Sequence, residues 1–153
     1  MKWETSVFPN HKTLTFIFKI MNTQANIEKV QALYEAFGQG NIPVVLGIVS
    51  ENFEWIDPGS PDIPYAGHYT SRSGFGDFFQ KMNTHAEITS FDIHSIRGVD
   101  DQVFATGRFG VRARVNNKTT DTDFVMIWNF SDGIPTSGQA YIDTNSIASI
   151  FRD

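Results

Sequence analysis

The chain has no cysteine, few basic residues, few leucines and no long apolar run. Without cysteine, disulfide bonds, thiol catalysis and thiolate metal sites are excluded. No apolar run approaches the ~18 residues of a membrane-spanning helix. Lys and Arg number 12 against 17 Asp and Glu, which gives a formal net charge of −5. We therefore expect neither nucleic acid nor an anionic membrane as a partner.

Aromatic residues are what the chain has in abundance. Its 153 residues include 14 Phe and 3 Trp, and aromatic and β-branched residues suit a pleated, half-buried surface better than a helical bundle. The length corresponds to one domain at ~100–200 residues per domain. Composition therefore favours a single domain built around a sheet.

The first twenty residues are expected to lie outside the domain. The apolar stretch from Leu14 to Ile20 is interrupted by Lys19 and is not followed by a small-residue cleavage site, so it makes a poor signal peptide. The alternation in 13–18 would suit an added strand, and the alternative is an extension upstream of Met21. We expect a peripheral extension over residues 1–20 that carries no chemistry, a domain over residues 21–153, and a cytoplasmic protein.

Three helices are expected in the first half of the chain. Asn22 or Thr23 can cap a helix that carries apolar residues at i, i+3, i+4 and i+7 and ends at Gly38. Asn41 can cap a short second helix with Pro43 in its first turn. A third helix has its core stripe at Phe75, Phe78, Phe79 and Met82.

Strands dominate the second half. A first strand spans 53–57, and a loop rich in proline and glycine follows to Thr70. Further strands are expected over 88–97, 103–115, 120–130 and 136–143, and Asp143 or Thr144 can cap a short terminal helix. The segment 103–115 alternates strictly, which predicts one buried face and one wetter face with Arg108, Arg112 and Arg114. This order predicts an α+β half-barrel, a curved antiparallel sheet with three helices on its concave face.

Asp57 is the strongest candidate for chemistry. It ends a strand on the same face as Phe53 and Trp55, beside Pro58 and Gly59. A carboxylate in apolar surroundings has its charged form disfavoured, so its pKa rises toward values useful in general acid–base catalysis. The alternative is that Asp57 caps the turn before Pro58.

Other candidates would bind rather than react. Trp55, Phe109, Met126 and Trp128 could line a pocket for a flat apolar molecule, or serve only as core. Tyr34 is also expected among the ligand-binding residues. His68 could contact a ligand or remain a surface residue. His85 and His94 are nine residues apart with no carboxylate at ligand spacing, so we expect no metal site and no cofactor.

Several short motifs resemble a known family. The chain is similar to the SnoaL-like family of the nuclear transport factor 2-like superfamily, which includes ketosteroid isomerases and limonene epoxide hydrolases. The resemblance covers residues 22–151. The segments that carry it are Val30-Gln-Ala-Leu-Tyr-Glu-Ala-Phe-Gly-Gln-Gly-Asn41, Trp55-Ile-Asp-Pro-Gly59, Pro64-Tyr-Ala-Gly67, Trp128-Asn-Phe-Ser-Asp-Gly133 and Tyr141-Ile-Asp-Thr144.

The resemblance implies a cone-shaped pocket and a homodimer that pairs through the exposed face of the sheet. Asp57 matches the isomerase general base, whereas the oxyanion-hole positions fall at Leu33, next to Tyr34, and near Met126. We expect either a proton-transfer enzyme of the isomerase, cyclase or dehydratase type on a small hydrophobic carbonyl compound, or a non-catalytic binding or dimerisation module of the same fold.

Overall fold

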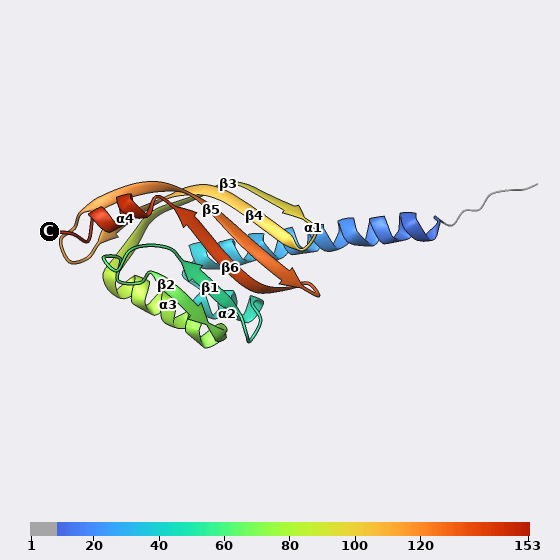
Figure 1. Cartoon of the computed structure of the whole chain (residues 1–153), viewed down its shortest axis with the longest axis horizontal. Coiled ribbons are helices and arrows are strands. Elements are labelled where there is room, and N and C mark those ends of the chain that lie inside the picture. The colour runs from blue at the N-terminus through green and yellow to red at the C-terminus, as the bar shows by residue number, and fades with distance from the viewer. Residues whose placement is uncertain (1–8) are drawn as a thin grey trace, which may run out of the picture.

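The computed structural model describes residues 9–153, and residues 1–8 of the expected extension lie outside this range. Four helices and a six-stranded sheet make up the described chain (Figure 1). The elements are α1 His11–Gly38, α2 Ile42–Ile48, β1 Glu54–Asp57, β2 Gly67–Thr70, α3 Ser71–His85, β3 Ala86–Val99, β4 Gln102–Ala113, β5 Thr119–Ser131, β6 Ile134–Ile142 and α4 Thr144–Ser149.

Helix α1 starts well before the expected cap. Asn10 is its N-cap and accepts a hydrogen bond from the Thr13 backbone N–H at 2.9 Å. The Thr23 hydroxyl donates to the Lys19 carbonyl one turn earlier, an arrangement that keeps threonine inside a helix instead of at its start. The predicted helix start at Asn22 or Thr23 is therefore wrong, and so is the alternative strand over 13–18. The predicted caps at Asn41 and Asp143 are confirmed.

The sheet has the order β2-β1-β6-β5-β4-β3. Neighbouring strands are antiparallel except β1 and β6, which pair in parallel, so the expected all-antiparallel sheet needs this one correction. Strand β5 lies inside the sheet, as its apolar residues on both faces predict. The short strand β2 was not predicted, because its four residues lie in the segment rich in proline and glycine.

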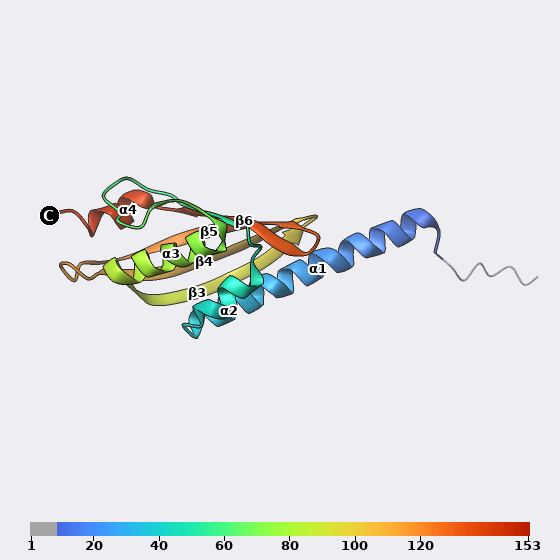
Figure 2. The same ribbon diagram turned by 90° about the horizontal axis from the view of Figure 1, so that it is seen from below.

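The sheet curves around helices α1, α2 and α3 (Figures 1 and 2). Register shifts in the β3–β4 and β5–β6 pairs mark bulges, which bend and twist a sheet locally. Gly107 lets β3 approach closely, since a Cβ there would lie 2.1 Å from the Asp92 carbonyl oxygen. Helices α1 and α3 pack on the concave face, and α2 packs against these two helices. No helix in residues 9–153 is long and apolar enough to cross a membrane.

Candidate functional site

A cavity of about 80 Å³ lies between the concave face of the sheet and helices α1 and α3. Nearly all its walls are aromatic or aliphatic, and most of them are buried. The lining residues are Leu33, Tyr34, Phe37, Trp55, Asp57, Tyr65, Phe75, Phe78, Phe79, Met82, Ile88, Phe91, Phe109, Met126, Trp128, Ala140 and Ile142.

Strand β1 brings Trp55 and Asp57 to this cavity. Side chains two apart on a strand share a face, and Trp55 and Asp57 are only 4% and 7% exposed. Burial raises the pKa of the Asp57 carboxyl to about 7, and no hydrogen bond from residues 9–153 offsets that shift. A carboxyl with such a pKa is present in both protonation states near neutral pH and can therefore give or accept a proton.

Tyr34 reaches the same cavity from α1. Its hydroxyl accepts a hydrogen bond from the Trp128 indole N–H at 2.9 Å and donates to the Met126 sulfur at 3.2 Å. Burial raises the pKa of Tyr34 above its usual value, so the hydroxyl keeps its proton. Because a thioether is a weak acceptor, the Tyr34 O–H remains able to donate to a better acceptor.

The Trp55 indole N–H has a different environment from that of Trp128. It is buried and has no hydrogen-bond partner among the described residues. Buried polar groups are usually satisfied, so an exception calls for an explanation. Tyr65, near the same carboxyl, has its pKa raised by burial and by the negative charge of Asp57. Among the lining residues, the ionisable groups are therefore the carboxyl of Asp57 and the hydroxyls of Tyr34 and Tyr65.

His68 does not reach the cavity. Strand β2 alternates so that Tyr69 is partly buried while His68 faces outward. Its Nε2 lies 3.3 Å from a Glu54 carboxylate oxygen, and both side chains are about half exposed. The alternative of a surface histidine is therefore the one that the geometry supports.

Most of the aromatic wall was not predicted as part of a site. Helix α3 was expected to bury its phenylalanines, but a stripe at helical spacing does not reveal which of its members border an empty space. Tyr65 lies in the loop before β2, where no periodicity applies. The residues missed were Leu33, Phe37, Tyr65, Phe75, Phe78, Phe79, Met82, Ile88, Phe91, Ala140 and Ile142.

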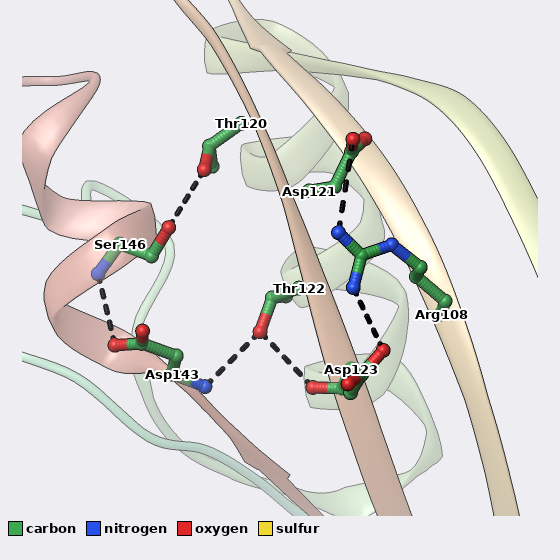
Figure 3. Close-up of polar contacts among 7 residues, drawn as sticks. All are labelled: Arg108, Thr120, Asp121, Thr122, Asp123, Asp143 and Ser146. Carbon is green, nitrogen blue, oxygen red and sulfur yellow. Dashed lines mark hydrogen bonds and ion pairs between the residues drawn. The ribbon is translucent and has the colours of Figure 1, made fainter.

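Arg108 of β4 lies on the opposite, convex side of the sheet (Figure 3). Arg108 lies between two carboxylates of β5, 2.9 Å from Asp123 and 3.9 Å from Asp121. Arg112 pairs with Glu87. Arg114 lies in the turn after β4, and its guanidinium donates to the carbonyl of Asn83 in α3. The prediction of three arginines on one strand face is therefore wrong for Arg114, and the other two both have carboxylate partners.

Metal-ligating side chains do not gather within residues 9–153, where no group of three His, Cys, Asp or Glu is placed to hold an ion. His85 ends α3, whereas His94 lies within β3. The buried acid of the cavity is a single carboxyl among apolar side chains, which is a poor ligand set for a divalent cation. The site offers proton transfer and hydrogen bonding.

Comparison with known proteins shows which family and which solved structures the chain is similar to. Residues 30–135 match the family model of the SnoaL-like domain, and no curated protein matches. An NTF2-like protein from Burkholderia xenovorans is 27% identical with a TM-score of 0.76, over 85% of this chain and 98% of its own.

Two more distant structures share the fold. TerC, co-crystallized with polyporic acid, is 22% identical with a TM-score of 0.75, over 84% of this chain and 99% of its own. A protein from Xanthomonas campestris described as a candidate polyketide cyclase is 19% identical with a TM-score of 0.68, over 86% and 99%.

Proposed function

Because this chain belongs to the SnoaL-like domain family, we propose that its cavity binds a small hydrophobic carbonyl compound and that Asp57 transfers a proton on it. The observation that carries the proposal is a buried carboxyl with a pKa of about 7 in a wall of aromatic side chains. The neighbour described as a candidate polyketide cyclase and the neighbour co-crystallized with polyporic acid support this class of molecule.

The chemistry follows from the polar groups. The Asp57 carboxylate takes a proton from a carbon next to the carbonyl, the C–H electron pair forms a C=C bond, and the carbonyl π pair moves to oxygen. The resulting enolate needs donors, because such charge is stabilised mainly by preorganised hydrogen bonds. The unpartnered Trp55 N–H and the Tyr34 O–H are the donors on offer. Return of the proton from Asp57 to the same or another carbon completes an exchange or an isomerisation.

Size restricts the ligand. A cavity of about 80 Å³ is smaller than the ~150 Å³ that accommodates benzene in an engineered core. Met82 and Met126 both border the space, and methionine side chains adapt easily to a changed cavity shape. The proposed ligand is therefore one small ring or a slender chain whose entry moves these two side chains.

Deuterium exchange tests the proposal. Cyclopentanone is incubated with the protein in D2O, and incorporation of deuterium next to the carbonyl is followed by NMR. We expect exchange above the buffer rate for the natural chain and for Asp121→Asn, a control on the convex face, but not for Asp57→Asn. Saturable binding of the ketone without exchange would favour the non-catalytic module, and the absence of both would contradict the proposal.

A further inference from the structure

The first part of α1, residues 11–22, projects from the body of the protein as a helical arm (Figures 1 and 2). Every residue of this arm is exposed. It nevertheless carries six exposed large apolar side chains, from Leu14 at 41% to Phe16 at 64%. An exposed apolar patch of this extent usually marks an interaction site.

Four of these side chains form a stripe. Leu14, Ile17, Phe18 and Met21 recur at i, i+3, i+4 and i+7, the spacing of one helix face. They are 41%, 42%, 63% and 61% exposed. The same spacing forms the seam between helices that pack side by side.

The stripe faces away from the body. At ~100° per residue, the buried residue Val30 of α1 lies about 160° around the helix from Leu14. Lys19 and Thr23 confirm the direction, because their side chains contact Asp100 in the β3–β4 turn at 2.7 and 3.1 Å. The apolar face of the arm is therefore not a continuation of the core-facing side of α1.

We propose that this stripe packs against the stripe of a second copy of the chain, with the two arms antiparallel. Side chains of this kind expose on the order of 100 Å² each when half-buried, so the four of the stripe offer roughly 400 Å² on each copy. A contact between two stripes thus buries roughly 800 Å² in total, which is the range of weak, transient interfaces below ~1,200 Å². The partner needs no matching pocket, because the same face occurs on every copy.

Charge decides the direction of the pairing. Glu28 and Glu35 lie on the same side of α1 as the stripe, within about 60° of Leu14 at ~100° per residue, and both are exposed. A parallel pair would set each glutamate against its own copy, and like charges at such positions repel. An antiparallel pair overlaps the arms alone and leaves these glutamates beyond the end of the partner's arm.

A lipid surface fits the arm less well. The arm has two lysines, and Lys19 is already paired with Asp100. The whole chain carries a net charge of −5, which opposes adsorption to the anionic lipids that hold basic amphipathic helices. The stripe also leads directly toward Glu28 on the same side of the helix.

Single-cysteine variants test the pairing, because the natural chain has no cysteine. Ile17→Cys places a thiol at the centre of the stripe, and Thr15→Cys places an exposed thiol on the other side of the helix. The full chain at micromolar concentration is treated with a short bifunctional maleimide. We expect Ile17→Cys to cross-link roughly tenfold faster or more, since pairing raises the local thiol concentration toward ~mM.

Mixed variants test the direction. A mixture of the Leu14→Cys protein and the Met21→Cys protein should cross-link faster than the Leu14→Cys protein alone, because antiparallel overlap places residue 14 of one copy opposite residue 21 of the other. Equal rates for Ile17→Cys and Thr15→Cys would overturn the proposal. So would flotation of the full chain with phosphatidylglycerol vesicles together with loss of the cross-link, which would make lipid the occupant.

Discussion

Asp57 combines two properties that rarely occur together in a stable core: it is ionisable and it is surrounded by apolar side chains. Burial disfavours the carboxylate, and its pKa is raised to about 7 because no described cation or hydrogen bond compensates. Retaining such a group costs stability at neutral pH. We interpret that cost as the consequence of the proposed proton-transfer role, since perturbed carboxyls concentrate at functional sites.

The cost itself is testable. In the unfolded chain Asp57 has a pKa of ~3.9, so between about pH 4 and 7 the native state binds more protons and stability falls as pH rises. Asp57→Asn removes the cost of burying an ionised carboxyl, so it should raise the free energy of unfolding by roughly 2–4 kcal/mol at pH 8. The gain should shrink toward zero near pH 4. Thermal unfolding of both proteins at the two pH values measures it.

The opposite pattern would identify a different role for the same residue. A variant less stable at pH 8, with the difference closing in acid, would mean that an ionised Asp57 caps the turn before Pro58. Asp121→Asn serves as the control, because that carboxylate is exposed on the convex face.

At the scale of elements, sequence periodicity predicted some features well and others poorly. Trp55 and Asp57 were placed on one face because alternation along a strand is local. The strand β2 was missed because four residues in a segment rich in proline and glycine show too little alternation. His68, for which the sequence left a ligand contact or a surface position open, lies on the exposed side of that strand. The phenylalanines of α3 were predicted to be buried but not to border a cavity, because that depends on which sheet residues stand opposite them.

The start of α1 shows the limit of capping signals. Asn22 and Thr23 have the residue types of an N-cap, yet both lie inside a helix that Asn10 caps. The alternation in residues 13–18 coexists with the helical stripe from Leu14 to Met21. Since the arm is exposed, the helix there is explained by the Asn10 cap and by continuity with the packed part of α1. The family motifs, in contrast, led directly to the fold, because they occur in order along most of the chain.

Most of the arm can be removed by truncation without removing a buried side chain of α1. Of the described residues, a chain that begins at Met21 loses the exposed residues 9–20. It also loses the surface ion pair between Lys19 and Asp100, but no buried side chain of α1. We expect cooperative thermal unfolding with a midpoint within about 4 °C of the full chain, the shift that ~1 kcal/mol produces at this size. A chain that begins at Gln31 should not fold, since it lacks the buried Asn26 and Val30. Loss of cooperativity in the first truncation would make the arm part of the folding unit.

At the scale of the whole molecule, the convex face of the sheet is a second surface open to a partner. Val125 of β5 and Tyr141 of β6 are register partners there, and they are 38% and 49% exposed. Arg108 beside them is already neutralised by Asp121 and Asp123 (Figure 3), so a second copy could approach without a large charge penalty. This surface is distinct from the arm, and the two contacts together would assemble more than two copies.

We therefore expect the chain that begins at Met21, which lacks the apolar stripe of the arm apart from Met21 itself, to form a homodimer through the convex face. Light scattering at micromolar concentration should give about twice its single-chain mass. Val125→Glu places a charge at the centre of this face, where a buried unpaired carboxylate is costly, and should reduce the mass to that of one chain. Val115→Glu makes the same change at a residue that is 79% exposed beyond β4 and should leave the dimer intact. A single-chain mass for the unsubstituted truncation would contradict pairing through the sheet.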